Sequence, residues 1–153
     1  WSQLDAPAWD ALYRGILRHT ASLLTASAAR MASGSGGVVL VIGSIEGIRP
    51  APQHSAYAVF KSAVHALVAA GAQEFGRRGV RVVGIAPGLI DRPGLSDDWP
   101  DGYRRWCTTV PLGRPVTVTE VSDAVAFLAS AAASAIAGVV LPVDGGWSAG
   151  PGW

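Results

Sequence analysis

The sequence predicts an α/β protein built around a parallel sheet, and three observations support this fold class. Two apolar runs rich in valine, residues 38–42 and 80–85, do not alternate with polar residues, which is typical of parallel strands buried on both faces. A third β-like run covers residues 139–143. Each run follows a longer segment whose apolar residues have helical spacing. Because this alternation implies right-handed crossovers, we expect the ligand crevice at the carboxyl ends of the strands.

Three main helices are predicted to accompany these strands. The first covers residues 8–31, with Asp5 in position to cap it. The second covers residues 56–78, is rich in alanine and ends in two arginines followed by a glycine. The third covers residues 119–130. Before it, residues 89–115 form a polar and aromatic segment that is long enough to act as a lid.

Length and composition indicate one globular domain that binds a small molecule. The chain has 153 residues, of which 50% are hydrophobic and 15% charged, so residues 1–153 are treated as one domain. The net charge is only +1 and the arginines are scattered, which argues against a nucleic-acid or membrane surface as partner. No apolar run is long enough to cross a bilayer, and no signal pattern is seen at the start.

Cysteine and histidine usage argue against a disulfide or a metal site. Cys107 is the only cysteine, so no intrachain disulfide or CxxC pair can form, and a reducing, cytoplasmic location is expected. His19, His54 and His65 lack the spacing of metal ligands, and structural or surface roles are expected for them.

Tyr57 and Lys61 form the strongest chemical motif. They are four residues apart near the start of the second predicted helix, so both side chains lie on one face. A phenol with a pKa of about 10 is a poor acid or base at neutral pH unless a cation stabilises the phenolate, and Lys61, the only lysine of the chain, is placed to do this. Ser44 follows the first strand and is expected to donate to a substrate oxygen. The alternative is that Tyr57 and Lys61 are simply neighbours on a helix surface.

Ser44, Tyr57 and Lys61 have the spacing of the Ser-Tyr-Lys set of short-chain dehydrogenases/reductases, and the sequence resembles this family over nearly its whole length. Other stretches that resemble family signatures are residues 85–88 (IAPG), 111–114 (PLGR), 120–121 (EV), 127–130 (FLAS) and 143–146 (VDGG). The VDGG stretch is similar to the acyl-carrier-protein reductase-like branch.

The resemblance implies an NAD(P)-dependent oxidoreductase that interconverts a ketone and a secondary alcohol by hydride transfer. Tyr57 would give or take the proton, Lys61 would lower the pKa of Tyr57 and bind the nicotinamide ribose, and Ser44 would orient the substrate. NAD and NADP cannot be distinguished. The cofactor-binding residues that it implies are Tyr57, Lys61, Pro87, Gly88 and Ile90.

The predicted lid and the long helices have two interpretations each. The lid carries three aromatic residues, Trp99, Tyr103 and Trp106, which either wall an apolar substrate site or pack the lid down. In the family the first two long helices pack against a second subunit, so the resemblance implies a homodimer or homotetramer of the full-length form. The alanine-rich helix faces equally suit packing against the sheet.

The resemblance further implies that the chain is the C-terminal half of a doubly wound, Rossmann-like sheet, with the N-terminal nucleotide-binding half absent. Only three of about six strands are counted, and no glycine-rich turn follows a strand. The first strand would then be an exposed hydrophobic edge, and this part alone is expected to be inactive. The alternative function is a non-catalytic half-domain that acts as an oligomerisation or complementation partner.

Three positions depart from the family pattern. The helix asparagine that supports a water relay to the lysine falls on Ile16, and the asparagine before the Pro-Gly turn falls on Val83. The threonine after that turn falls on Arg92, which either pairs with a phosphate or acidic substrate or is simply solvated.

Overall fold

One three-stranded parallel sheet forms the centre of the fold. The computed structural model describes residues 4–150, and in this range the strand order is β1-β2-β3. The strands are β1 Gly37–Ile42, β2 Val80–Pro87 and β3 Val140–Val143, and Val39 of β1 lies opposite Val82 of β2. The α/β fold and the parallel sheet predicted from the sequence are confirmed. β2 is buried along almost its whole length, which explains its unalternated apolar sequence.

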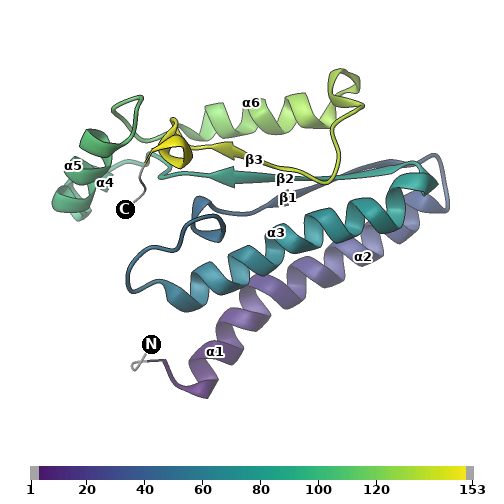
Figure 1. The fold of residues 1–153 in the computed structure, drawn as a ribbon, viewed down its shortest axis with the longest axis horizontal. Helices are drawn as coiled ribbons and strands as arrows, with labels where there is room; N and C mark the ends of the chain where they lie inside the picture. The colour runs from purple at the N-terminus through teal and green to yellow at the C-terminus, as the bar shows by residue number, and fades with distance from the viewer. Residues whose placement is uncertain (1–3, 151–153) are drawn as a thin grey trace.

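Helices cover both faces of the sheet. A long N-terminal helix, α1 Ala6–Leu12 continuing into α2 His19–Ala32, lies beside α3 Ser55–Phe75 on one face, while α6 Val118–Ala129 lies on the other (Figure 1). Successive β2 residues divide between these faces: Val82 belongs to the core under α2 and α3, and Val83 to the core under α6. This is the alternation that a strand geometry imposes.

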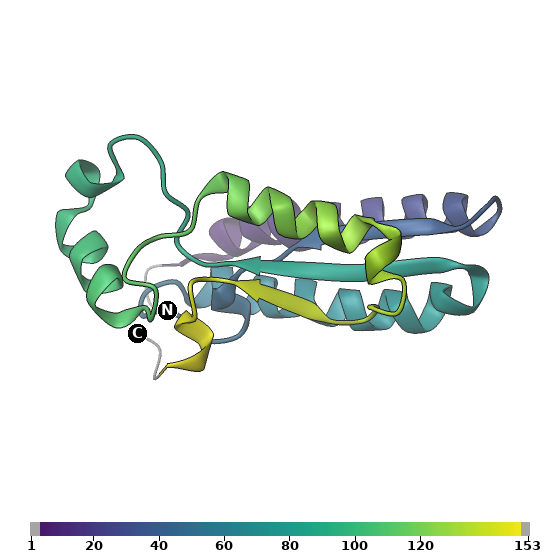
Figure 2. The ribbon, with the colours of Figure 1, turned by 90° about the horizontal axis from the view of Figure 1, so that it is seen from above.

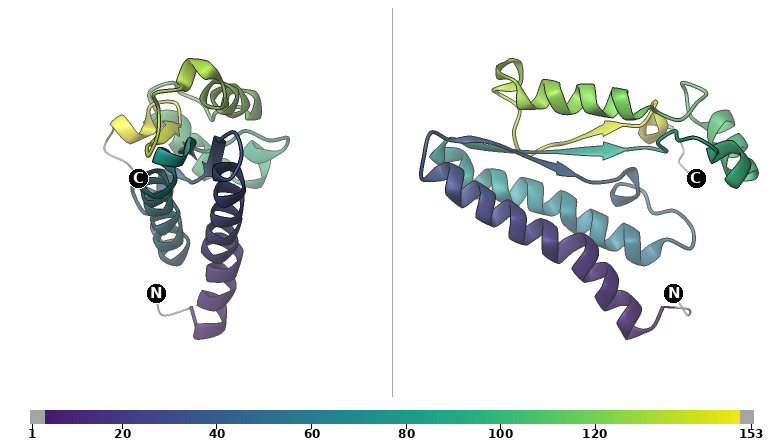
Figure 3. Two further views of the ribbon diagram at one scale, coloured as in Figure 1. Left: turned by 90° about the vertical axis from the view of Figure 1, so that its right-hand side faces the viewer. Right: turned by 180° about the vertical axis from the view of Figure 1, so that it is seen from behind.

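The first helix differs from the uninterrupted helix that the sequence predicts. A π-helical segment, Tyr13–Arg18, separates α1 from α2, and the helix changes direction there (Figure 3). The Thr20 hydroxyl donates to the Ile16 carbonyl at 2.7 Å, and such back-bonding from a hydroxyl competes with the helix amides. The expected cap is present, because the Ala8 N–H donates to Asp5 Oδ1 at 3.0 Å.

Two glycines bring the amino ends of β1 and β2 together. Gly36 and Gly79 have φ angles of 80° and 77°, and a Cβ on Gly36 would lie 2.4 Å from the Gly79 carbonyl oxygen. Gly79 follows a short 3-10 turn, Gly76–Arg78, that ends the second long helix. The helix end expected from the sequence is therefore a real stop, made by a residue that tolerates the left-handed conformation.

The predicted lid lies beyond the carboxyl ends of the strands. It contains two short helices, α4 Leu95–Asp98 and α5 Pro100–Thr109, and Figure 2 shows both past the arrowheads of the sheet. The lid returns to α6 through a capping box, in which Thr117 and Glu120 exchange bonds.

β1 has a free edge within the described part of the chain. It pairs only with β2 there, as the sequence led us to expect, and Ile42 is 49% exposed. A groove runs along this edge between β1 and α2. It is lined by His19, Thr20, Leu23, Leu24, Ser27, Val39, Leu40, Val41 and Ile42.

Candidate active site

Ser44 lies at the carboxyl end of β1, where the chain turns back toward α3. Its backbone is extended, with φ −165° and ψ 151°, and it caps the 3-10 turn Ile45–Gly47 by accepting from the Glu46 N–H at 3.2 Å. The side chain is largely buried. Because the Ser44 oxygen already accepts a bond, its own proton is left to donate to another oxygen.

Tyr57 and Lys61 lie on one face of α3, as their spacing predicts. The Lys61 Nζ is 5.7 Å from the centre of the Tyr57 ring, and it donates to the Ile42 carbonyl at the end of β1 at 3.1 Å. Burial lowers the pKa of Lys61.

His65 lies one turn further along the same face of α3 and contacts the Ser44 loop. The Ser44 N–H donates to its Nε2 at 3.3 Å. The pKa of His65 is lowered, first by burial and then by the charge of Lys61. The sequence alone did not assign this residue to the site, although its position four residues after Lys61 was visible.

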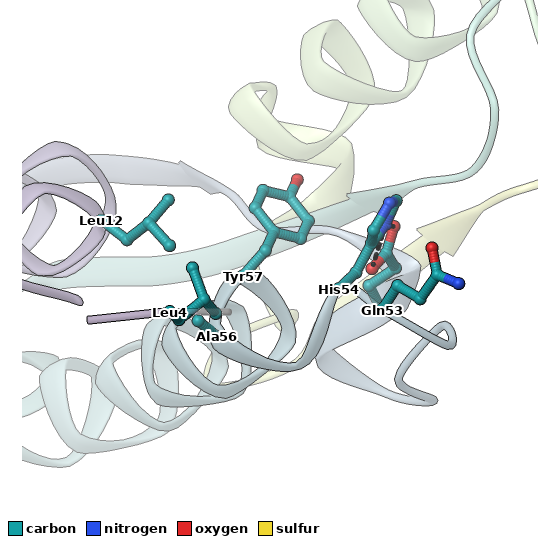
Figure 4. Close-up of a pocket in the computed structure, with 7 residues that line it drawn as sticks. Leu4, Leu12, Gln53, His54, Ala56 and Tyr57 are labelled. Carbon is teal, nitrogen blue, oxygen red and sulfur yellow. Dashed lines mark hydrogen bonds and ion pairs between the residues drawn. The ribbon is translucent and has the colours of Figure 1, made fainter. Parts of the chain in front are cut away.

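A pocket of about 380 Å³ opens beside Tyr57 (Figure 4). Leu4, Leu12 and Ala56 give it an apolar part, and the Tyr57 side chain extends from α3 with its hydroxyl directed away from the helix. The polar part comprises Gln53 and a pair formed by His54 and Glu46, in which Nδ1 and Oε1 are 3.0 Å apart.

Glu46 and His54 were not singled out as site residues from the sequence. The Glu46 side chain is only 13% exposed, so its carboxylate is held at the pocket by the imidazole rather than by bulk water. An apolar wall with a few fixed polar groups is the usual character of a small-molecule site.

The turn after β2 presents backbone groups on the same side of the sheet. The Gly88 N–H donates to the Val143 carbonyl at 3.0 Å, and a Cβ on Gly88 would lie 2.9 Å from Cα of Asp144, so glycine is required for this close approach. Beyond Pro87 and Gly88, Ile90 forms a parallel bridge with Val116.

The bridge fixes the direction of the Ile90 backbone. The residues on either side of Ile90 make the two hydrogen bonds of this bridge. The Val116 N–H donates to the Leu89 carbonyl at 2.9 Å, and the Asp91 N–H donates to the Val116 carbonyl at 2.7 Å. Because alternate residues of a strand point their amides to opposite sides, the N–H and C=O of Ile90 face away from Val116. Side by side, they offer one donor and one acceptor.

The three lid aromatics occupy different environments. Trp106 is 3% exposed, and its ring stacks on Trp147 with 6.1 Å between centres and 10° between planes. It packs in a cluster with Ile45, so the lid is anchored next to Ser44. Trp99 is 43% exposed. Tyr103 is half-buried and lies near Cys107, which raises the pKa of the phenol.

The residues at the three departing positions have local partners. Ile16 lies in the π-helical segment and packs against the core under α2 and α3. Val83 is fully buried under α6. Arg92 donates to Asp98 at 2.6 Å, so its charge is paired within the lid.

Neither a metal-binding cluster nor a membrane-spanning helix is found in residues 4–150. These residues contain no cluster of three or more side chains that could hold a metal ion. None of the helices described for them is both long enough and apolar enough to span a membrane.

The arrangement defines a class of protein: an α/β sheet that carries a serine, a tyrosine and a lysine where its first strand ends. The family described as enoyl-(acyl carrier protein) reductase matches residues 3–148. The 2,5-dichloro-2,5-cyclohexadiene-1,4-diol dehydrogenase of Sphingobium indicum is 32% identical over 150 residues, which cover 98% of this chain and 57% of that protein. The chain belongs to the short-chain dehydrogenase/reductase family.

Solved structures agree with this assignment. A gluconate 5-dehydrogenase from Burkholderia cenocepacia, in complex with NADP and tartrate, is 30% identical with a TM-score of 0.90, and the match covers 97% of this chain and 59% of that one. A 7α-hydroxysteroid dehydrogenase complexed with NADH and 7-oxo glycochenodeoxycholic acid is 29% identical with a TM-score of 0.88, covering 94% and 57%. The chain thus spans less than three fifths of each of these relatives.

Proposed function

We propose that this chain carries the proton-transfer part of the active site of an NAD(P)-dependent oxidoreductase that interconverts a ketone and a secondary alcohol. The observation that carries the proposal is the placement of Lys61 against the Tyr57 ring, at the strand end that also holds Ser44. A phenol with a cation at this distance, on the wall of a pocket, can hand a proton to a carbonyl oxygen and take it back from a hydroxyl.

Each of the three side chains has a separate task. In the reduction direction, Tyr57 donates its proton to the carbonyl oxygen as that oxygen gains negative charge. The Ser44 proton, which is not used within the loop, forms a second bond to the same oxygen. Lys61 keeps the resulting phenolate stable and so allows Tyr57 to act near neutral pH.

The backbone at Ile90 suits a nicotinamide group. When bound, the dinucleotide supplies or accepts the hydride. A primary carboxamide has one acceptor and one donor group, which complement the N–H and C=O that Ile90 directs away from Val116. Pro87 and Gly88 bring this backbone close to the strand ends, and Lys61 is within reach of the nicotinamide ribose in this proposal. Either NAD or NADP is proposed as the cofactor.

The proposal extends to assembly and location. Tyr13 is 41% exposed and Val59 is 45% exposed, so the outer surface of the π-helical segment and of α3 has apolar side chains that a second subunit would cover. We propose a homodimer or homotetramer of the complete gene product, located in the cytoplasm.

A second candidate function rests on the free edge of β1. An unpaired strand edge with an apolar groove beside it is a surface on which another chain adds a strand. In this case the chain would serve as a non-catalytic half-domain that complements a partner bearing the nucleotide-binding half. Calorimetric titration of the 153-residue chain with NADH and NADPH tests this candidate. Tight binding by this chain alone would show that a separate nucleotide-binding half is not needed.

The test of the catalytic proposal compares Tyr57→Phe with Tyr13→Phe in the complete gene product. Tyr13 is an exposed tyrosine of the π-helical segment, so it controls for the loss of a phenol hydroxyl as such. On a panel of small ketones with NADH and NADPH, Tyr57→Phe should lower kcat by roughly 10²–10⁴-fold, the usual contribution of a general acid. Tyr13→Phe should leave kcat within about 2-fold. Undiminished turnover of Tyr57→Phe would remove the residue from the proton-transfer role.

A further inference from the structure

The imidazole of His65 fills a slot in the loop that carries Ser44. We propose that His65 is a positioning residue, whose unprotonated Nε2 accepts the Ser44 N–H and thereby holds Ser44 against the helix face of Tyr57 and Lys61. The inference rests on the proposed oxidoreductase function and adds a residue to it. The contact joins positions 21 residues apart in the chain.

Two glycines make room for this ring. A Cβ on Gly43 would lie 2.3 Å from the His65 Nε2, and a Cβ on Gly47 would lie 2.7 Å from its Cε1. Real Cβ atoms do not come so close to other atoms, so any side chain at either position would push the ring out of the loop. The loop is therefore shaped around His65 on both sides of Ser44.

Separate bonds keep the loop in place around the ring. The Gly43 N–H donates to the Ile85 carbonyl at 2.7 Å, and the Ser62 hydroxyl donates to the Gly47 carbonyl at 2.8 Å. These bonds tie the two ends of the loop to β2 and to α3. His65 holds the middle, where Ser44 lies, so we expect its loss to shift Ser44 without detaching the loop.

The chemistry of the contact fixes the protonation of the ring. A backbone N–H can only donate, so Nε2 must present a lone pair, and the proton of the neutral ring is then on Nδ1. Protonation at Nε2 would turn the ring N–H against the Ser44 N–H, so that two donors would face each other. It would also place a second positive charge beside Lys61. The position of Ser44 is therefore coupled to the charge of His65.

Burial and the positive charge of Lys61 favour the neutral form of His65. Lys61, on the same helix, is the cation that acts on it, and with burial it lowers the pKa of His65. The loop packed against the ring carries Glu46, which pairs with His54, and Arg49, which donates to the Gly150 carbonyl. From β2, the Ile85 carbonyl accepts from the Gly43 N–H of this loop.

The first test uses substitutions in the complete gene product. In His65→Gln the amide oxygen can take the place of Nε2 as acceptor, whereas His65→Leu keeps an apolar body and removes the acceptor. We expect kcat for ketone reduction to fall by about 10-fold or more in His65→Leu and to stay within about 3-fold in His65→Gln, because only the former leaves the Ser44 N–H without its partner. Equal losses in the two variants would overturn the proposal.

A double-mutant cycle with Ser44→Ala separates positioning from general support of the fold. If His65 acts through Ser44, adding His65→Leu to Ser44→Ala should cause no further loss of kcat beyond about 2-fold. Multiplying losses would overturn the proposal. Full activity of His65→Leu beside an inactive Tyr57→Phe would also overturn it, while leaving the proposed function standing.

The pH profile supplies a readout that does not depend on the folding of His65→Leu. In ketone reduction Tyr57 must be protonated, so acidification does not remove its proton. In the wild-type protein, kcat for ketone reduction should therefore fall as His65 becomes protonated, at a pH below the ordinary histidine pKa of about 6.5. This fall should be absent in His65→Gln. The same fall in both proteins would contradict the coupling of Ser44 to His65.

Discussion

Replacing Trp147 by alanine should detach the lid anchor and destabilise the protein strongly. The Trp147 ring is 3% exposed and stacks on Trp106. A buried indole side chain removes roughly 200 Å² from water, which corresponds to about 5 kcal/mol at about 25 cal/mol per Å², and buried Trp→Ala changes typically cost about 3–5 kcal/mol. Since domains are stable by about 5–15 kcal/mol, we expect Trp147→Ala to lose a large part of the free energy of unfolding.

Urea unfolding of the complete gene product, followed by circular dichroism, measures this loss. Trp99→Ala is the matched control, because Trp99 belongs to the same lid but is 43% exposed. Because it buries little more than half of its area, on the same scale it should cost about 3 kcal/mol, against about 5 kcal/mol for Trp147→Ala. If Trp147→Ala costs no more than Trp99→Ala, the anchor does not exist as described.

The stacking itself is tested by a cycle of Trp106→Leu and Trp147→Leu, which keep apolar volume and so leave the protein folded. Offset or stacked aromatic pairs contribute about 0.5–1.5 kcal/mol beyond their buried area. We therefore expect the double variant to be less destabilised than the sum of the single variants by about this amount. Additivity to within about 0.3 kcal/mol would show that the two rings do not interact.

Two further predictions concern pH and backbone conformation. The pKa of Glu120 is lowered to about 2, chiefly by its bond to Arg114. Its stabilising contribution should therefore be complete above pH ~4.5 and decline as pH falls toward ~2. Urea midpoints from pH 7 to pH 3 should fall more steeply in the parent than in Glu120→Gln, and equal slopes would exclude this contribution. Gly36→Ala should destabilise by more than about 1 kcal/mol, because it combines a left-handed backbone with a clash against Gly79. Gly76→Ala, whose Cβ would meet open space, should be neutral or slightly stabilising in the same unfolding experiment, and a similar loss in both would contradict the strain.

The secondary structure was predictable because its causes are local. Continuous valine-rich runs indicate buried strands, and apolar residues at helical spacing indicate helices. All three strands and the main helices therefore lie close to the predicted bounds. The π-helical segment Tyr13–Arg18 was not predicted. It depends on whether the Ile16 carbonyl accepts from the Thr20 hydroxyl or from a backbone amide. The spacing of hydrophobic residues does not predict which of these bonds forms.

The candidate site divides in the same way. Tyr57 and Lys61 belong to one helix, so their common face follows from a spacing of four residues. The bond from Ser44 to His65 and the pair formed by Glu46 and His54 depend on how a loop folds back on α3. No spacing rule relates such positions.

The lid aromatics illustrate the limit of composition. Trp99, Tyr103 and Trp106 were equivalent in the sequence, as residues suited either to a substrate wall or to packing. Only the placement of Trp147 next to Trp106 made one of them an anchor, since burial is a property of what surrounds a side chain.

The sequence by itself determined the α/β class, the strand and helix order and the Tyr57–Lys61 pair, because each depends on residues adjacent in the chain or one helical turn apart. The tertiary structure alone decided that His65 and two glycines close around Ser44, and that the lid is pinned beside it. These features arise from contacts between segments distant in sequence, whose geometry is set by the packing of helices on the sheet.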